Sequence, residues 1–340
     1  MKYFITGVSG FIGSNLAREL AMDGHTVNAI IRSPLNGDLK DLPNIHLFHG
    51  DLFDNEVLLK AMEGCDVVFH LAALAKAWVK DPKDFYHINV EGAANIFLAA
   101  KLSGVKKVVF TSTAGTMSPS PEDEPTDEST RRSMPYFNEY EVTKARAEEL
   151  ARDFSQNGLP VIIVNPTRVF GPGPLNASNS LTKMIDGYRK GKWRIIPGDG
   201  RKIGNYVYID DVVHGHLLAA QRGKAGERYI LGGENLTFDE FFSRMGKLTG
   251  KSHRMFHLPL SLMTASARFM EWQNRLTGIP PLITAGWVKK FLSHWNLSSD
   301  KAKLELGYHI TPFETGVRST IEWLEREEVS AELVLSYQKA

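Results

Sequence analysis

The segment from Thr6 to Gly13 constrains the fold more than any other part of the sequence. Its three glycines, spaced three residues apart, stand between a β-branched run and a helical pattern. A side chain at these glycines would block the tight turn, the approach of a ligand and the packing of helix on strand. Backbone N–H groups at the start of the helix would face an anion above the turn. The order of strand, turn and helix therefore predicts that a dinucleotide pyrophosphate binds here, through Gly7, Ser9, Gly10, Phe11, Ile12 and Gly13.

Short β-branched runs alternate with longer helical patterns through the first half of the chain. The segments from Gly10 to Ala21 and from Val90 to Lys101 place apolar residues three and four apart, as helices that cover a sheet do. This alternation is typical of βαβ units, so we predict an α/β fold with a doubly wound parallel sheet of the Rossmann type. The expected strands are Tyr3–Thr6, Thr26–Ile31, Ile45–Phe48, Val67–His70, Lys107–Thr111 and Val161–Val164.

The pattern changes at Gly171, where glycine and proline become frequent, and this change predicts a smaller C-terminal substrate lobe. We assign residues 1–170 plus 205–233 to the dinucleotide-binding domain and 171–204 plus 234–330 to the lobe. Residues after about Glu327 are expected to form a frayed helix or a tail. The other expected elements are strands at Tyr206–Ile209 and Glu227–Leu231 and helices at Asp239–Leu248 and Leu260–Leu276.

Composition excludes several classes of partner. The chain carries 40 Lys and Arg against 39 Asp and Glu, a net charge of +1, so we expect neither nucleic acid nor a membrane to be bound. The single cysteine, Cys65, excludes an internal disulfide and fits a reducing compartment, and no histidine pair has the spacing of metal ligands. The first strand begins at Lys2, which leaves no room for a leader peptide, and no apolar stretch is long enough to span a bilayer. We therefore expect a cytoplasmic protein without a metal.

The end of the second expected strand indicates which dinucleotide is bound. NAD-binding proteins of this fold usually place an acid there, to accept from the adenosine ribose hydroxyl. Here an aliphatic residue, Ile31, stands at that place and is followed by Arg32 and Ser33. The arginine fork can hold a 2′-phosphate with the serine as a second donor, although an arginine at this place can also be a solvated surface residue. We predict NADP as the cofactor, with NAD as the alternative.

Two further strand ends supply cofactor contacts at the carboxyl edge of the sheet, where ligands of open α/β sheets bind. Asp51, followed by Leu52, is a candidate to accept from the adenine amino group, and the alternative is that it caps the next helix. After the fourth strand, Leu71, Ala72 and Ala73 are expected to let the backbone approach the cofactor.

Tyr140 and Lys144 begin a helical run and share one helix face, because they are four residues apart. A nearby cation favours the phenolate and moves the tyrosine pKa down toward a range useful for proton transfer. The spacing alone is not specific, since Tyr188 and Lys192 have it as well. Context separates the two pairs, because a cluster of hydroxyls, Thr111–Thr113, follows the fifth strand and precedes Tyr140. Those hydroxyls can bind a substrate oxygen beside the tyrosine.

With these motifs in order, the chain resembles the extended short-chain dehydrogenases/reductases, in the NAD-dependent epimerase/dehydratase family and its dihydroflavonol-reductase-like group. The resemblance runs along nearly the whole chain. The matching stretches are Thr6–Gly13, Gly50–Leu52, Phe69–Ala73, Asn89–Gly92, Phe110–Thr116, Tyr140–Lys144, Asn165–Gly173, Tyr208–Val212 and Ser299–Ala302.

The resemblance implies an NAD(P)-dependent oxidoreductase and assigns roles to individual residues. Thr113 takes the place of the catalytic Ser or Thr, with Ser112 as a second candidate, while Tyr140 is the proton donor and Lys144 its activator. Asn89 matches an asparagine that joins a proton relay in some members, and a structural role at a helix kink is the alternative. Helices Val90–Lys101 and Tyr140–Asp153 often form the dimer contact in this family, so a homodimer is expected. The expected contacts to the nicotinamide half of the cofactor are Thr111, Tyr140, Lys144, Pro166, Thr167 and Val169.

Three functions remain open on the sequence. The first is reduction of a carbonyl on a small, fairly apolar substrate with NADPH, and the second is a nucleotide-sugar epimerase or dehydratase that uses bound NAD(P). Sugar-nucleotide relatives generally carry an arginine and an acid where this chain reads Gly204-Asn205-Tyr206, so their diphosphate clamp is absent, although Arg201 and Lys202 stand close by. The third is a cofactor-binding redox sensor, which usually has a broken Tyr-x3-Lys pair.

The aromatic and sulfur-containing residues of the lobe favour the first function, the reductase. Most of them are expected to pack in the core, because such residues at helical spacing usually do, while a subset lines a pocket for an apolar ketone. They are Phe137, Tyr206, Phe256, Met263, Phe269, Trp272 and Trp287.

Overall fold

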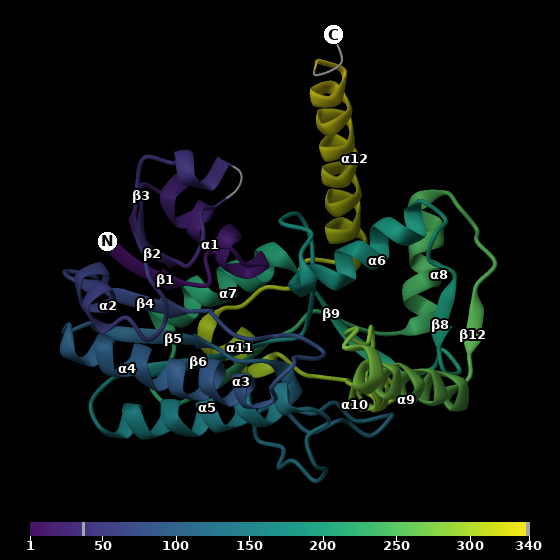
Figure 1. Cartoon of the computed structure of the whole chain (residues 1–340), viewed down its shortest axis with the longest axis horizontal. Coiled ribbons are helices and arrows are strands. Elements are labelled where there is room, and N and C mark those ends of the chain that lie inside the picture. Colours follow the sequence, from purple (N-terminus) through teal and green to yellow (C-terminus); the bar gives the residue numbers. More distant parts are fainter. Residues whose placement is uncertain (36–37, 338–340) are drawn as a thin grey trace.

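Seven parallel strands form the central sheet of the protein, in the order β10-β6-β5-β4-β1-β2-β3 (Figure 1). The structure, a computed structural model, describes residues 1–35 and 38–337. The order of the strands reverses beside β1, as in doubly wound sheets, so the predicted fold is confirmed. The strands are β1 (Lys2–Thr6), β2 (Thr26–Ile31), β3 (Ile45–His49), β4 (Val67–His70), β5 (Lys107–Thr111), β6 (Val161–Pro166) and β10 (Arg228–Leu231).

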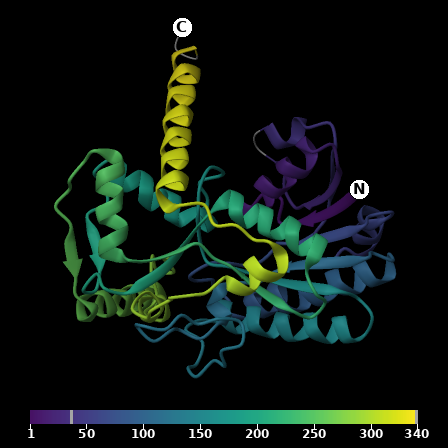
Figure 2. The ribbon, with the colours of Figure 1, turned by 180° about the vertical axis from the view of Figure 1, so that it is seen from behind.

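Helices cover both faces of this sheet, which Figures 1 and 2 show from opposite sides. Helices α1 (Phe11–Met22), α7 (Ile209–Arg222) and α11 (Asp300–Leu306) lie on one face. Helices α2 (Asn55–Met62), α4 (Gly92–Leu102) and α5 (Glu139–Gln156) lie on the other face. The short helix α3 (Lys83–Tyr86) leads into a π-helical turn, His87–Glu91, directly before α4. Because the sheet is covered on both sides, its strands are buried along nearly their whole length except for β3 at the edge.

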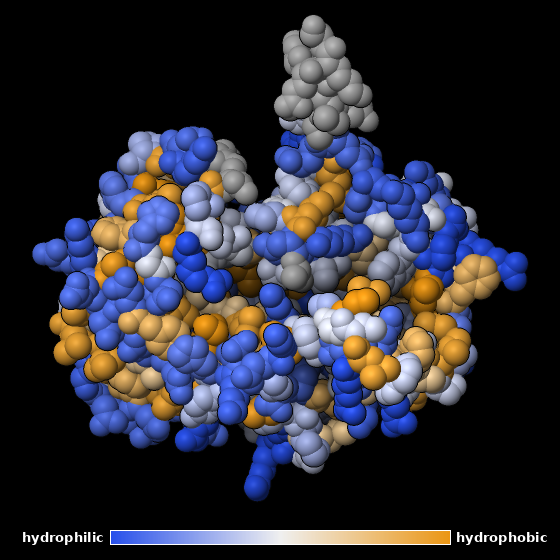
Figure 3. All heavy atoms as spheres, viewed as in Figure 1, coloured by the Kyte–Doolittle hydropathy of each residue, from blue (hydrophilic) through white to orange (hydrophobic). Residues whose placement is uncertain are grey.

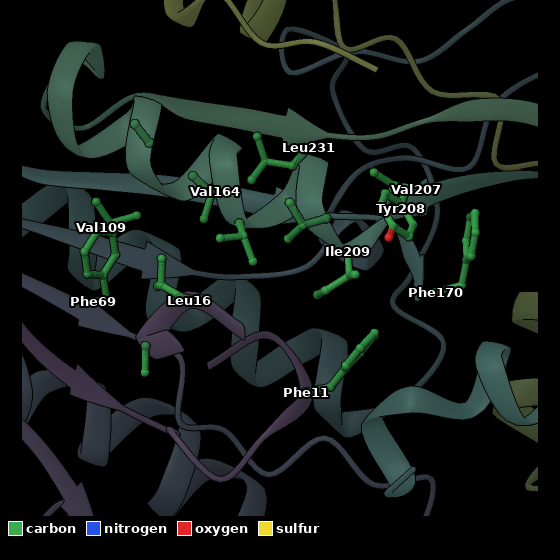
Figure 4. Close-up of a cluster of buried hydrophobic side chains, with 14 of the residues drawn as sticks. Phe11, Leu16, Phe69, Val109, Val164, Phe170, Val207, Tyr208, Ile209 and Leu231 are labelled. Atoms are coloured by element: carbon green, nitrogen blue, oxygen red, sulfur yellow. The ribbon is translucent and has the colours of Figure 1, made fainter. Parts of the chain in front are cut away.

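Side chains of each strand alternate between two cores. In β1, Tyr3 and Ile5 belong to the core under α1 and α7, whereas Phe4 belongs to the core under α2, α4 and α5. Figure 4 shows the first core, where Val109 and Val164 of the sheet lie close to Leu16 and Ile209 of the covering helices. The alternation follows from the period of two in a strand. It holds α1, and therefore the glycine turn, rigidly over the sheet.

The lobe has small sheets of its own beside the carboxyl edge of the main sheet. Strand β9 (Ile203–Tyr208) lies between β7 (Arg168–Phe170) and β11 (Glu234–Thr237), and β8 (Ile195–Pro197) pairs with β12 (Phe256–Leu258). Within the segment 205–233 that we assigned to the dinucleotide-binding domain, α7 and β10 pack with the main sheet, but β9 lies in the three-stranded sheet of the lobe. The lobe helices are α6 (Ser180–Arg189), α8 (Phe238–Thr249), α9 (Leu260–Thr277) and α10 (Ala285–Phe291).

Helix α12 (Phe313–Tyr337) ends the described chain; its first turns pack against α6, α8 and β9, and its C-terminal part projects away from the other elements (Figures 1 and 2). The expected helices at Asp239–Leu248 and Leu260–Leu276 are confirmed as α8 and α9. In the part of the chain that the structure describes, no helix combines the length and apolar character needed to cross a bilayer.

The expectation that most of the seven aromatic and sulfur-containing residues singled out in the lobe pack in the core was wrong, because only two of them are buried. Phe256, Phe269 and Trp272 each expose more than half of their surface, whereas Tyr206 and Met263 are buried. Helical spacing does not distinguish a side chain that packs in the core from one that faces outward on a helix that is apolar on both sides.

Candidate active site

A cavity of about 840 Å³ lies at the carboxyl edge of the main sheet, between the sheet and the lobe. The sheet end is lined by the glycine turn and the ends of β2, β4 and β5, and the lobe end by α6, α9 and α10. Among the described residues that line it, Asp51 is the only acid, whereas Arg32, Arg168 and Lys290 are cationic. This balance of charge suits an anionic ligand.

The glycine turn fits a pyrophosphate closely. Gly7 has φ of 77°, and a Cβ there would lie 2.7 Å from the backbone nitrogen of Ala72. A Cβ at Gly13 would collide with the carbonyl oxygen of Gly7. The residue that caps α1, Gly10, has no side chain to satisfy the amides of the first turn, which are therefore available to phosphate oxygens. Gly7, Ser9, Gly10, Phe11, Ile12 and Gly13 all line the cavity, as predicted.

At the end of β2, Arg32 is exposed and lines the cavity directly after Ile30 and Ile31. Its guanidinium is therefore within the site where the adenosine half of a dinucleotide would lie. Ser33 is exposed too but does not line the cavity, so the structure places only one of the two expected phosphate donors at the site.

Asp51 lines the cavity, and one of its carboxylate oxygens accepts from the backbone N–H of Phe53 at 2.8 Å. The alternative that Asp51 caps the next helix was wrong, because Asp54 caps α2 by accepting from the N–H of Val57. Leu52 lines the cavity and packs over Gly92 of α4. The second oxygen of Asp51 remains available to an adenine amino group.

The backbone after β4 is held close to the glycine turn. The hydroxyl of Thr6 accepts from the N–H of Ala72 at 3.1 Å and bonds Nδ1 of His70 at 2.7 Å. Burial lowers the pKa of His70 to about 3, so the imidazole is neutral. Leu71, Ala72 and Ala73 line the cavity, as predicted.

The hydroxyl of Tyr140 faces the cavity and is hydrogen-bonded to the side chain of Thr113. Asn138 begins α5 by accepting from the N–H of Glu141, which fixes the first turn that carries Tyr140. Burial raises the tyrosine pKa to about 12, and the bond from Thr113 lowers it less than burial raises it. The expected lowering by the Lys144 cation is therefore wrong in direction, and Tyr140 is a neutral phenol at pH 7.

Lys144 is buried beneath the cavity instead of lining it. Its Nζ donates to the carbonyl oxygen of Thr111 at 2.7 Å and lies 4.1 Å from the centre of the Phe110 ring. Desolvation lowers its pKa to about 7, although the carboxylate of Glu148 raises it. The hydroxyl of Thr111 donates to Nε2 of His216, since Nδ1 of that ring donates to the Val212 carbonyl. Thr111 thus joins β5, α5 and α7 at the floor of the site.

The two candidate hydroxyls after β5 have different partners. Ser112 donates to Glu148 at 2.6 Å, whereas Thr113 lies against Tyr140. The same oxygen of Glu148 accepts from Thr116 at 2.8 Å and from the amide of Asn165 at 2.7 Å. Glu148 therefore fixes the loop that presents Thr113, and the geometry favours Thr113 over Ser112 as the group that meets a substrate.

Asn89 is buried in the π-helical turn and lines no part of the cavity. The side-chain oxygen of Asn89 accepts from the backbone N–H of Leu74 at 2.7 Å. Its side-chain NH2 donates to the Thr143 hydroxyl at 3.1 Å and to the backbone carbonyl of Leu74 at 3.3 Å. These bonds tie the loop after β4 to α5. They fit the structural alternative for Asn89.

The lobe end of the cavity carries a guanidinium surrounded by aromatic rings. Arg168 lies 5.4, 5.2 and 5.6 Å from the ring centres of Tyr206, Phe238 and Phe291 and donates to the Tyr206 hydroxyl at 3.2 Å. A Cβ at Gly204 would collide with the guanidinium, so the glycine provides its space. Arg168 and the three aromatic residues around it all line the cavity.

A second cation, Lys290 of α10, lines the same end. Its Nζ lies 2.9 Å from the carboxylate of Glu141, which is fully buried and turned away from the cavity. Burial lowers the lysine pKa, Glu141 raises it, and the nearby Arg168 and Arg132 lower it. Trp287, one turn earlier, lines the cavity with a buried Nε1 that lacks a hydrogen-bond acceptor.

Of the remaining predicted contacts, those to the nicotinamide lie at the cavity, whereas the two cations near β9 do not. Pro166, Thr167 and Val169 line the cavity, and the Thr167 hydroxyl is buried without a partner. Arg201 and Lys202 do not line it, and Lys202 is hydrogen-bonded to His294. They are therefore no substitute for a diphosphate clamp.

Four functional positions were missed on the sequence: Glu148, Arg168, His216 and Lys290. Glu148 had a local signal, because it lies one helical turn after Lys144 on the same face. The others had none, since they reach the site only through pairing of β7 with β9 and packing of α7 and α10.

The chain is similar to known proteins along most of its length. The model of the NAD dependent epimerase/dehydratase family matches residues 3–232. A Synechocystis sp. protein named as a candidate dihydroflavonol 4-reductase is 31% identical over 329 residues, covering 95% of this chain and 94% of the relative. The 4-hydroxy-2-methyl-3-oxo-4-farnesyl-3,4-dihydroquinoline-1-oxide ketoreductase of Stigmatella aurantiaca is 30% identical over 91% of this chain and 92% of its own. The solved UDP-glucose 4-epimerase of Thermotoga maritima with UDP-glucose has a TM-score of 0.78 at 25% identity, covering 96% of this chain and 99% of that chain.

Proposed function

The chain belongs to the NAD-dependent epimerase/dehydratase family of extended short-chain dehydrogenase/reductase enzymes, and we propose that it reduces a carbonyl on a mostly apolar substrate with NADPH. The observation that carries the proposal is the Thr113–Tyr140 pair, set between a dinucleotide cradle and an apolar, aromatic lobe end of one cavity. A ketone oxygen between these two hydroxyls would be polarised by both.

When bound, the reduced nicotinamide supplies a hydride to the carbonyl carbon. Tyr140 donates its phenolic proton to the carbonyl oxygen, and Thr113 holds that oxygen by a second hydrogen bond. The raised pKa of Tyr140 keeps the proton in place at neutral pH until negative charge develops on the oxygen. Lys144 holds the Thr111 carbonyl, so it positions the end of β5 that presents Thr113.

The preference for NADPH over NADH rests on Arg32. Its guanidinium lines the cavity next to aliphatic Ile31, where a 2′-phosphate would need a cation and a ribose hydroxyl would need an acid. NAD remains the alternative cofactor.

The lobe end indicates the substrate. Met263, Phe291 and Trp287 offer apolar surface, and Arg168 is the guanidinium among them. We propose a substrate with a large apolar body and an anionic or strongly polar group that meets Arg168. The Stigmatella relative is named for a farnesylated oxo compound, which has the same combination of a ketone and a large apolar group.

The second candidate function is a nucleotide-sugar epimerase or dehydratase. It is favoured by the likeness to the epimerase structure and by Arg168, which could hold a diphosphate in place of the absent clamp. The third, a redox-sensing regulator, needs the cofactor site alone.

Titration of the cofactor-stripped protein with NADPH and NADH, repeated with apolar ketones and UDP-sugars, separates these candidates. NADPH preference with ketone-dependent loss of its absorbance supports the reductase. Tight retention of NAD with UDP-sugar binding points to the epimerase. Cofactor binding without turnover of either class points to the regulator.

We also propose a cytoplasmic homodimer, as the family resemblance implies. Helices α4 and α5 expose Leu98, Leu102 and Val142, which are the apolar side chains that such a contact would cover. Sedimentation of the purified protein would give the mass expected of two chains, and a monomer at all concentrations would exclude the dimer.

A further inference from the structure

The outward face of α9 is apolar although it is exposed. Leu262, Phe269, Trp272 and Leu276 recur at spacings of three and four residues, or their sum, and each exposes more than half of its surface. The rings of Phe269 and Trp272 lie 5.8 Å apart, so they form one aromatic pair. This spacing places all four side chains on one face of the helix.

The inward face of the same helix is apolar as well. Met263 and Ala267 are buried against Val288 of α10. A helix with apolar side chains on two faces normally has both of these faces covered. The outward face of α9 therefore lacks a cover in the described structure.

The apolar surface continues past the end of the helix. Ile279 and Leu282 expose 57% and 90% of their surface, and the Ile279 carbonyl is tied back to Asn274 of α9 by a 2.8 Å hydrogen bond. Figure 3 shows apolar residues gathered over the part of the molecule where α9 and α10 lie. We call this surface the α9 patch: Leu262, Phe269, Trp272, Leu276, Ile279 and Leu282.

Positive charge predominates in the segment that carries the α9 patch. Residues 250–292 contain six Lys and Arg, of which Lys290 lines the cavity, but one acid, Glu271, whose carboxylate accepts from the backbone N–H of Ala285. Arg268 and Arg275 are exposed and lie on α9 next to the apolar stripe. The net charge of +1 for the whole chain hides this local excess.

This positive charge distinguishes between two possible partners of the α9 patch, a second copy of the chain and a lipid surface. A two-fold contact between copies of the chain would place each cationic border against an equal one, and like charges across an interface are unfavourable. An anionic lipid surface neutralises the arginines and accepts the Trp, Phe and Leu side chains at the level of its headgroups. A helix with Arg at the border and Trp, Phe and Leu on its face has the composition of an interfacial membrane helix.

The α9 patch is also one helix away from the cavity. The lobe end of the cavity is lined by Met263, on the inner side of α9, and by Ile283 and Trp287, which follow the patch in the chain. An apolar substrate dissolved in lipid would therefore meet the protein at the elements that enclose its binding site.

We propose that the α9 patch docks flat on an anionic phospholipid bilayer and that the cavity takes its substrate from that bilayer. The docking stands on the surface alone, whereas delivery of the substrate rests on the proposed function. For this face of the molecule, the docking replaces the expectation of no membrane partner, which came from the net charge.

The test is flotation of the full-length protein with vesicles of phosphatidylcholine, with and without phosphatidylglycerol. The protein should float with the anionic vesicles and be released by high salt. The double variant Phe269→Ser with Trp272→Ser should weaken vesicle binding at least about tenfold. The double variant Arg268→Gln with Arg275→Gln should weaken vesicle binding about fivefold for each arginine. The control is Leu304→Ser, which removes a still more exposed apolar side chain from α11, outside the patch, and should leave binding unchanged.

The variants must retain NADPH binding, which shows that they are folded, because the α9 patch is outside the cofactor end of the cavity. Absence of flotation on anionic vesicles overturns the docking. The docking is also overturned if the wild-type chain is a dimer and the double variant Phe269→Ser with Trp272→Ser is a monomer, since the patch would then join two copies. Flotation without reduction of any ketone leaves the docking intact and overturns the proposed function instead.

Discussion

The carboxylate of Glu141 lies 2.9 Å from Nζ of Lys290, so the residue next to Tyr140 in α5 is ion-paired with a lobe helix 149 positions further along the chain. Glu141 is fully buried, and only 17% of the Lys290 side chain is exposed. The pair connects the helix that carries the phenol to the wall of the substrate cavity.

Glu141→Gln should therefore destabilise the protein by about 3–5 kcal/mol, because it leaves a buried ammonium without its closest counter-charge. The measurement is urea unfolding of the single variants and of Glu141→Gln combined with Lys290→Met. The double variant should regain part of the lost stability, because it removes the unpaired ammonium but leaves the guanidinium of Arg132, 3.5 Å from Glu141, without its counter-charge. Simple addition of the two single losses would show that the residues do not interact.

Tyr140→Phe should lower kcat by about a thousandfold and leave NADPH affinity nearly unchanged, because it removes the proton donor and no cofactor contact of comparable strength. Tyr188→Phe is the matched control, since it removes a buried tyrosine hydroxyl outside the cavity, bonded to the Lys251 carbonyl. A Tyr140→Phe enzyme as active as the Tyr188→Phe enzyme would exclude the assigned role.

Lys144 should make stability depend on pH. Its folded-state pKa is about 7, against the higher value of an unfolded lysine, so between these values the unfolded chain binds more protons. The free energy of unfolding of the wild type, relative to Lys144→Met, should rise with pH across this window, by up to about 1.4 kcal/mol per pH unit. Below pH 7 the difference should level off. A flat difference from pH 7 to 10 in chemical denaturation would mean that the lysine is not desolvated.

Arg32→Ala should weaken NADPH binding about tenfold or more and hardly change NADH binding, because the guanidinium would pair only with the 2′-phosphate. Calorimetric titration with both cofactors gives the ratio. Ser33→Ala is the comparison, and since Ser33 does not line the cavity its effect should be small. Equal losses for NADPH and NADH in Arg32→Ala would remove the phosphate assignment.

Arg168→Gln should reduce kcat/KM for a long-chain 3-oxo acid by about tenfold or more while leaving the matching methyl ketone nearly unaffected. The pair of substrates differs in the carboxylate that the guanidinium would meet. If both fall alike, Arg168 supports the wall of the cavity through Tyr206 and binds no anionic group.

The sequence determined the fold class, the glycine turn and the Tyr140–Lys144 pair, because each depends on residues close together in the chain. Strand period, helix period and the steric freedom of glycine are local properties, so Thr6–Gly13 could be assigned without knowledge of its neighbours. The pKa of Tyr140 was misjudged on the same local basis, since burial by distant segments raises it by more than the hydrogen bond from Thr113 lowers it.

Only the tertiary structure decided what lies at the lobe end of the cavity and on the outer face of α9. Arg168, Lys290 and Trp287 reach the cavity because β7 pairs with β9 and α10 packs beside α5, and such long-range contacts leave no periodic trace in the sequence. Met263 and Trp272 have the same apolar character and lie on the same helix, yet one is buried and the other is exposed. Which side of an apolar helix meets the core depends on the surfaces available to cover it, and those are set by the whole fold.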